Sequence, residues 1–210
     1  MKITKIIFLC TSALGLMSCN NDSSVDLLEI ESQQVSNLYA PQIGGNAPGQ
    51  APISGQFTKF DFETGSTTLS ETEWDVAFRG TTIIVNGGTS LGTTDEPERI
   101  GNVAVYIAVG TFGEITEVNP SAFVQDSSTG YAIPLGGGNG WYDYNFMLNL
   151  ITPTPGRVLV FRTTEGKYAK VEILSYYENA PANPDSTVDE ARYYTFNYVY
   201  QPNSGLTTFE

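Results

Sequence analysis

Histidine is absent from all 210 residues of the sequence, and this absence limits the available chemistry more than any residue that is present. Ser-His-Asp and Cys-His nucleophiles, His-based zinc sites and bis-histidine haem ligation all require an imidazole. The carboxylates that remain for acid–base work include Glu71, Glu73, Asp75, Glu114 and Glu117. A carboxylate pair could hydrolyse a glycosidic bond, but nothing in this spacing places two of them across a cleft. We therefore expect no enzyme activity.

The first residues have the composition of a bacterial secretion signal. A basic segment, Met1–Lys5, precedes an apolar run, Ile6–Leu16, that is too short to span a bilayer comfortably. The run ends in Leu16-Met17-Ser18-Cys19, which resembles a lipobox, where signal peptidase cuts before a cysteine that carries a diacylglyceryl group. We predict a signal peptide over residues 1–18 and lipidation of Cys19, which would anchor an outer-membrane lipoprotein at the cell surface or the periplasmic face. An ordinary signal peptide with a chance cysteine is the alternative.

The charge of the chain disfavours one class of partner. The sequence has 23 acidic and 10 basic residues and a net charge of −13, and Lys2 and Lys5 leave with the predicted signal. Because the phosphates of nucleic acids repel such a surface, we expect no nucleic acid partner. Cys10 leaves as well, so the processed chain has no intramolecular disulfide.

Residues 19–54 are polar and contain several turn-forming residues, among them Pro41, Pro48-Gly49 and Pro52. This composition predicts a tether between the lipid and the folded domain. The apolar residues between Val25 and Leu38 follow neither the helical nor the strand period cleanly, so that stretch is left unassigned. The folded domain is predicted over residues 55–210.

From Gly55 onward the dominant hydrophobic period is two, as in Phe60–Glu63 and Trp74–Arg79. The segment Val103–Val109 is apolar on both faces, which predicts a central strand covered on each side. Further strands are expected at Thr81–Val85, Trp141–Leu148, Arg157–Thr163, Lys167–Tyr177 and Arg192–Tyr200. This pattern predicts an all-β fold with two layers.

Three groups of segments share their order and spacing with a known family. They are Trp74-Asp75-Val76-Ala77-Phe78-Arg79 leading to Asn86-Gly87-Gly88, then Arg157–Arg162 with Gly166–Val171, and finally Tyr194–Tyr200. Together they resemble the HmuY family of haem-binding, surface-anchored lipoproteins of Bacteroidetes, from about Phe57 to Tyr200, and the lipobox fits that family too. The resemblance implies a two-layer antiparallel sandwich with ligand-gripping loops at one end.

The resemblance also implies the function of a haemophore, which captures haem and passes it to an outer-membrane transporter. Members of the family ligate the iron with two histidines, or with methionines in some relatives, and one ligand follows the tryptophan that matches Trp141. That position falls at Phe146-Met147, whereas the upstream region, Gly113–Gly140, has neither histidine nor methionine. A thioether can ligate haem iron. Met147 is therefore the first candidate axial ligand, with a buried structural methionine as the alternative.

A second axial ligand would have to be another residue type, and tyrosinate oxygen can bind ferric haem. Tyr131, Tyr142 and Tyr144 are the candidates by position, for ligation or for stacking together with Trp141. Binding through one axial ligand, binding of an iron-free porphyrin, and loss of haem binding also stay open. No metal other than haem iron is expected, because Asp185–Glu190 lacks the spaced ligands of a calcium loop.

Haem carries two propionates, which require cationic partners. The basic residues that remain for them are Lys59, Arg79, Arg99, Arg157, Arg162, Lys167, Lys170 and Arg192. The alternative to a tetrapyrrole is a carbohydrate or another small ligand, bound on an aromatic platform of Trp141 with Tyr142 or Tyr144. Such a platform would be an exposed coplanar pair on a sheet face, whereas a haem site would be a pocket between loops.

Overall fold

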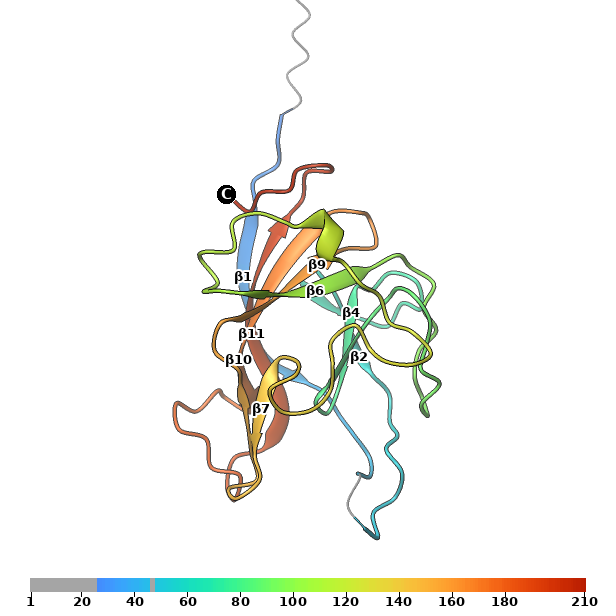
Figure 1. Ribbon diagram of the computed structural model, residues 1–210, viewed down its shortest axis with the longest axis vertical. Coiled ribbons are helices and arrows are strands. Elements are labelled where there is room, and N and C mark those ends of the chain that lie inside the picture. Colours follow the sequence, from blue (N-terminus) through green and yellow to red (C-terminus); the bar gives the residue numbers. More distant parts are fainter. Residues whose placement is uncertain (1–25, 46–47) are drawn as a thin grey trace, which may run out of the picture.

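The computed structural model describes residues 26–45 and 48–210, and its regular secondary structure is almost entirely β-strand (Figure 1). The predicted signal peptide, residues 1–18, and the predicted lipidation site, Cys19, lie outside the described residues. A 3-10 turn occurs at Pro120–Ala122. The strands are β1 (Glu31–Tyr39), β2 (Thr58–Asp61), β3 (Ser66–Thr68), β4 (Val76–Arg79), β5 (Thr82–Val85), β6 (Ala104–Val109), β7 (Tyr142–Asn145), β8 (Leu150–Pro153), β9 (Arg157–Arg162), β10 (Tyr168–Tyr177) and β11 (Ala191–Gln201).

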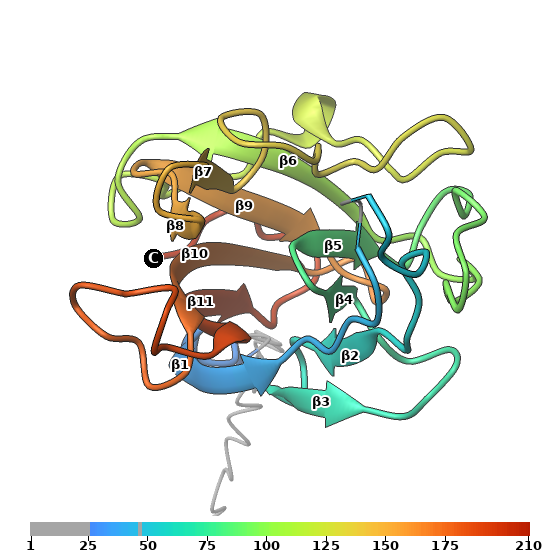
Figure 2. The ribbon, with the colours of Figure 1, turned by 90° about the horizontal axis from the view of Figure 1, so that it is seen from below.

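Two antiparallel sheets form the layers of the fold. The larger sheet has the strand order β1-β11-β10-β9-β6, and the smaller has the order β3-β2-β4-β5 (Figure 2). A separate two-stranded hairpin, β7-β8, extends from one end. The arrangement confirms the predicted all-β, two-layer antiparallel fold.

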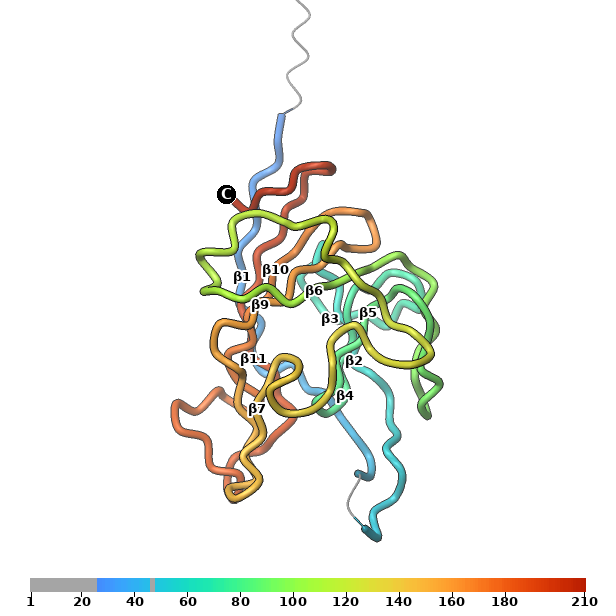
Figure 3. The backbone as a smooth tube through the Cα atoms, in the orientation of Figure 1, coloured from blue at the N-terminus to red at the C-terminus, as the bar shows by residue number. Residues whose placement is uncertain are grey.

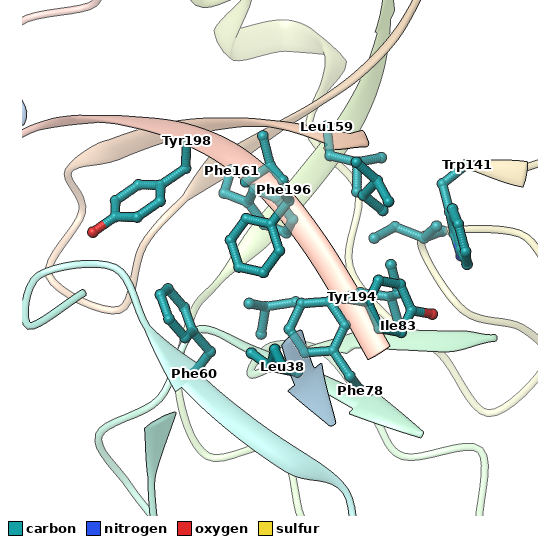
Figure 4. Close-up of a cluster of buried hydrophobic side chains, with 14 of the residues drawn as sticks. Leu38, Phe60, Phe78, Ile83, Trp141, Leu159, Phe161, Tyr194, Phe196 and Tyr198 are labelled. Carbon is teal, nitrogen blue, oxygen red and sulfur yellow. The ribbon is translucent and has the colours of Figure 1, made fainter. Parts of the chain in front are cut away.

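Large apolar side chains from both sheets fill the space between them (Figure 4). Alternate residues of β11, namely Tyr194, Phe196 and Tyr198, point inward and are fully buried. They meet Phe60 of β2 and Phe78 of β4, with ring centroids 4.9 to 5.9 Å apart. The period-two pattern of this segment therefore arises because alternate side chains pack into the core.

Loops cover the outer face of the larger sheet and one of its edges. The sequence predicts a central position for Val103–Val109, and this prediction is wrong, because β6 is an edge strand. Its two faces are nevertheless both covered, since Val105 packs into the core and Tyr106 packs into an apolar cluster on the outer face. Beyond β6, Val105 and Val124 exchange backbone hydrogen bonds of 2.9 and 3.0 Å. A loop thus protects the edge that another strand would otherwise cover.

The N-terminal strand lies within the segment for which the sequence predicts a tether. Residues 31–39 of that segment are β1, which pairs along its length with β11. The register shifts between Val35 and Leu38, where Asn37 has a φ of 56°. This bulge interrupts the alternation of buried side chains, and for that reason neither period is clean in the sequence. The sheet therefore starts before residue 55.

Buried polar groups connect the two layers and their loops. The Asp75 carboxylate is 1% exposed and accepts hydrogen bonds from the backbone N–H groups of Phe62 (3.0 Å) and Thr164 (2.8 Å). Burial raises the pKa of Asp75 to about 7, although these N–H groups oppose the shift. Arg99 donates to the Asp126 carboxylate through Nε (3.1 Å) and Nη2 (2.9 Å). These polar groups are used within the fold and are not available to a ligand.

Strand pairing brings three segments together at one end of the domain (Figure 3). Tyr39, at the end of β1, pairs with Tyr193 near the start of β11, so the segment after β1 and the β10–β11 loop emerge side by side. The β7–β8 hairpin joins them, because the Ile151 N–H donates to the Tyr177 hydroxyl at 3.0 Å. We call this region the loop end: residues 40–45 with 48–56, the hairpin 142–153 and the loop 178–190.

The start of the described chain lies at the opposite end. There, Leu28 and Asn203 are joined by two hydrogen bonds of 2.8 Å, one in each direction between the Leu28 backbone and the Asn203 side chain. Residues 26–30 and the C-terminal segment are therefore at the top of Figure 1, and the loop end is at the bottom. Within residues 26–45 and 48–210, no helix has the length and apolar character needed to cross a membrane.

Candidate ligand site at the loop end

Two asparagines stabilise the turn of the β7–β8 hairpin. The Asn145 side-chain oxygen accepts hydrogen bonds from the backbone N–H groups of Met147 (3.1 Å) and Leu148 (3.2 Å). Asn149 adopts a φ of 50°, a conformation that asparagine tolerates better than most residues, and accepts a 3.0 Å hydrogen bond from the Tyr144 hydroxyl. The strand expected over Trp141–Leu148 therefore ends at Asn145, and strand alternation does not extend to Met147.

The tip of this hairpin is apolar and exposed. Phe146, Met147 and Leu148 are 74%, 76% and 61% exposed, respectively. Burying such side chains removes apolar surface from water, which is the main favourable term in binding an apolar ligand. The alternative of a buried structural methionine therefore does not describe Met147. Its thioether is accessible to a ligand.

Two cavities open beside the hairpin and share Ser186 as a lining residue. The first has a volume of about 420 Å³ and lies between β8, the end of β10, the start of β11 and the segment after β1. The second, about 370 Å³, lies between the hairpin tip and the β10–β11 loop, and Met147 and Leu148 line it. The Ser186 hydroxyl donates to the Leu148 carbonyl, which ties the β10–β11 loop to the tip. Cavities of this size are in the range that small ligands and cofactors occupy.

Phenol rings form much of the wall of the first cavity. Tyr144, Tyr176 and Tyr177 line it together with Ile151. Burial raises the pKa of Tyr176 and, to a lesser extent, that of Tyr177. Because a phenol must lose its proton to ligate iron strongly, these two rings serve better as walls and hydrogen-bonding groups than as iron ligands.

The structure places the other predicted site residues in three different surroundings. Tyr144 is on the hairpin, half exposed, and lines the first cavity. Trp141 and Tyr142 are buried at the base of the hairpin, where the Trp141 indole N–H donates to the Thr81 carbonyl at 3.0 Å. Tyr131 packs against the outer face of the smaller sheet, in a separate apolar cluster. Met147 and Tyr144 are thus on the same hairpin but line different cavities, and Tyr131 lies apart from both.

The aromatic platform considered for a carbohydrate is not formed by Trp141 and Tyr142. Their rings are inclined at 58°, and both side chains are at least nine-tenths buried. A partly exposed pair, Tyr39 and Tyr193, stacks ring on ring with centroids 4.8 Å apart. Those two rings cover each other instead of lying edge to edge in one plane, so they do not provide the flat surface on which a sugar stacks.

Sequence reasoning does not identify Tyr176 and Tyr177 as site residues, and it leaves Arg192 as one of eight equivalent cations. All three line the first cavity. Their positions depend on how β8, β10 and the segment after β1 meet in space, and the sequence pattern carries no signal for that. Among the described residues, no group of three or more His, Cys, Asp or Glu side chains could hold a metal ion.

Comparisons with known proteins match most of the sandwich domain. The sequence model of the HmuY protein family matches residues 54–198. The HmuY analog of Tannerella forsythia, in its apo form, superposes with a TM-score of 0.52 at 13% identity, covering 85% of this chain and 100% of that one. At this identity the superposition supports the fold alone. No match is found among proteins of curated function.

Two further solved structures, both from Bacteroides, are similar to this chain. A candidate HmuY-like heme binding protein from Bacteroides vulgatus has a TM-score of 0.48 and 15% identity, covering 83% of this chain and 93% of that one. A candidate lipoprotein from Bacteroides fragilis has a TM-score of 0.47 and 14% identity, covering 84% and 94%, respectively.

Proposed function

This chain belongs to the HmuY family, and on that premise we propose that it is a lipid-anchored binding protein that holds haem or a related tetrapyrrole at its loop end. The anchor is the thioether-linked lipid on Cys19, and the protein acts by binding instead of by catalysis. An outer-membrane transporter is the partner to which the ligand passes.

The observation that carries the proposal is the exposed apolar tip beside two cavities. The consecutive side chains of Phe146, Met147 and Leu148 are exposed to solvent. The backbone of this turn is fixed by hydrogen bonds to the Asn145 side chain. A flat apolar ligand that lies against the tip would bury this surface, and the energetic gain explains why the tip is apolar.

The residues present suit haem with an axial ligand that is not histidine. Met147 would supply the thioether, which ligates iron without having to lose a proton. Tyr144, Tyr176 and Ile151 would contact the faces and edges of the macrocycle from the first cavity. When bound, haem supplies the iron, and the chain supplies the position, an apolar contact surface and one sulfur ligand.

The position of the site suits an anchored protein. Asp26, the first described residue, is seven residues after Cys19 and lies at the end of the domain opposite the hairpin (Figure 1). A lipid at Cys19 would hold that end toward the membrane. The loop end would then point away from the membrane, where a ligand and a partner protein can reach it.

Titration of the soluble domain, residues 20–210, with ferric haem tests this function. We expect a saturable change in the Soret band and a ferrous spectrum of the thioether type. The Met147→Leu variant keeps the apolar volume and loses the sulfur, so it should lose the thioether signature and about tenfold in affinity, or about 1.4 kcal/mol. Phe146→Leu is the matched control on the same turn and should keep the signature.

Absence of saturable haem binding by the unmodified domain would remove haem as the ligand. An unchanged ferrous spectrum in Met147→Leu would remove Met147 as the ligand while leaving the site in place. The anchor is tested separately with the full chain. Cys19→Ala should abolish incorporation of labelled lipid and association with the membrane fraction, and unchanged membrane association would contradict the predicted lipidation.

A further inference from the structure

Arg192, the second residue of β11, has an unusual backbone conformation and lines the first cavity. Its φ is 76°, in the left-handed region that is unfavourable for residues other than glycine. The strain occurs where the register between β10 and β11 shifts, between Ser175 and Tyr177. Strain of this kind persists only where the surrounding structure enforces it, and it is often found at functional sites.

The guanidinium of Arg192 donates to one backbone carbonyl and lies beside the Tyr176 phenol, and it has no carboxylate partner within residues 26–45 and 48–210. Its Nη1 donates to the backbone carbonyl of Gln42 at 2.6 Å, which fixes the head group between β11 and the segment after β1. Arg192 forms no ion pair with any residue in the described ranges. It is also close enough to the buried Tyr176 phenol for its charge to oppose the rise in the Tyr176 pKa that burial causes.

The other basic residues of the described chain are occupied or lie elsewhere. Lys59 and Lys167 pair with Glu71 and Glu63, at 2.6 and 2.5 Å. Arg99 is held in buried ion pairs, and Lys170 donates hydrogen bonds to two backbone carbonyls. Arg79 donates hydrogen bonds to residues 93–94, and Arg162 donates one to Asn102. The Arg157 side chain has no hydrogen-bond or ion-pair partner among the described residues, but it lines neither cavity.

We propose that Arg192 binds a carboxylate of the ligand. This inference rests on the proposed function and adds the chemical class of the ligand to it: a flat apolar molecule with an ionised carboxylate, as haem has in its propionates. A guanidinium presents parallel N–H donors to a carboxylate and stays charged at any physiological pH. With Nη1 held by Gln42, the remaining N–H groups of Arg192 are the donors for this contact.

A neighbouring acidic group would restrict where that carboxylate can lie. Asp189 lines the same cavity, and its carboxylate accepts a 2.7 Å hydrogen bond from the backbone N–H of Asp185. Since Asp189 repels an anion and Arg192 attracts one, the ligand carboxylate belongs on the Arg192 side of the cavity. Asp189→Asn should therefore strengthen haem binding by about two- to threefold at low salt.

The test compares haem with haem dimethyl ester, in which both propionates are neutral. The soluble domain, residues 20–210, is titrated with each compound in the same mild detergent, alongside Arg192→Gln, Arg192→Lys and the control Arg157→Gln. The unmodified domain and Arg157→Gln should bind haem about tenfold or more tightly than the ester. Arg192→Gln should bind both compounds equally, and Arg192→Lys should keep part of the preference because it keeps the charge.

A preference for haem that persists in Arg192→Gln would overturn the role of Arg192, and so would equal binding of haem and ester by the unmodified domain. In both of these outcomes the proposed function stands, because haem still binds. Failure of the unmodified domain to bind either compound would overturn the proposed function and this inference together. Near-ultraviolet circular dichroism of each variant checks that the sandwich is folded, and Arg192→Lys decides the question should Arg192→Gln not fold.

Discussion

The interior of the sandwich and the loop end contain the same kinds of side chain, but only the interior uses them for packing. Phe196 of β11 is completely buried between the sheets, whereas Phe146 on the hairpin tip is 74% exposed. Arg99 is buried in ion pairs with Glu96 and Asp126, whereas Arg192 has no carboxylate partner among the described residues. The difference separates an interior whose groups are used in packing and ion pairs from a loop end whose groups are exposed, as the proposed binding site requires.

The largest expected effect comes from removing one phenylalanine ring from each region. Phe196→Ala should lower the free energy of unfolding by about 3–5 kcal/mol, because it leaves a cavity in a closely packed core. Phe146→Ala should change the free energy of unfolding by less than about 0.5 kcal/mol, as exposed substitutions usually do. It should, however, weaken haem binding. Urea unfolding of both variants measures the difference, and equal losses of stability would contradict the distinction between the two regions.

A smaller effect concerns the pH dependence of the interior. The pKa of Asp75 is raised from 3.8 to about 7 by burial, so between these values the folded chain binds a proton that the unfolded chain does not. By linkage, this group's contribution to stability is full below about pH 4 and is lost as the pH rises through about 7. Asp75→Asn, which does not titrate, should make the slope of stability against pH between 5 and 7 less negative. An unchanged slope would show that Asp75 stays ionised in the folded chain.

The smallest expected effect is that of salt on the loop end. Because Arg192 and Asp189 line an open cavity, ions in solution screen their interaction with a ligand carboxylate. The haem affinity of the unmodified domain should fall modestly between low salt and 0.5 M salt, and that of Arg192→Gln should not fall. The same salt change should leave the ester affinity unchanged, and a parallel loss for the ester would assign the salt effect to something other than Arg192.

Much of the fold could be predicted from the sequence, because its strands alternate cleanly and have recognisable turns. The strands predicted at Arg157–Thr163 and Lys167–Tyr177 are joined by a turn at residues 164–166, with Gly166 at a φ of 76° and a 2.8 Å hydrogen bond from the Thr163 N–H to the Lys167 carbonyl. The strand β1 was not predictable in the same way, since the bulge at Asn37 breaks its alternation. β3 and β8 are missed because β3 has three polar residues and no apolar one, and β8 does not alternate cleanly and ends in a proline.

The candidate site could be predicted only where it lies on one continuous segment. Met147 and Tyr144 are on the β7–β8 hairpin, and the resemblance to the HmuY family points to that hairpin directly. Tyr176, Arg192 and the cavity they line depend on a bulge and on loop contacts between segments that are far apart in the sequence. The burial of Tyr142 and Trp141 depends in the same way on packing at the hairpin base. No local pattern encodes either feature.

The central claim is that ligand binding takes place at the loop end and leaves the sandwich unchanged. Hydrogen exchange of the soluble domain, measured by mass spectrometry with and without saturating haem, tests this most directly. We expect slower exchange in residues 142–153 and 178–192 when haem is added, and no change in β9 or in the first half of β10. Protection confined to the sandwich strands, or saturable binding without protection of the β7–β8 hairpin, would contradict the account.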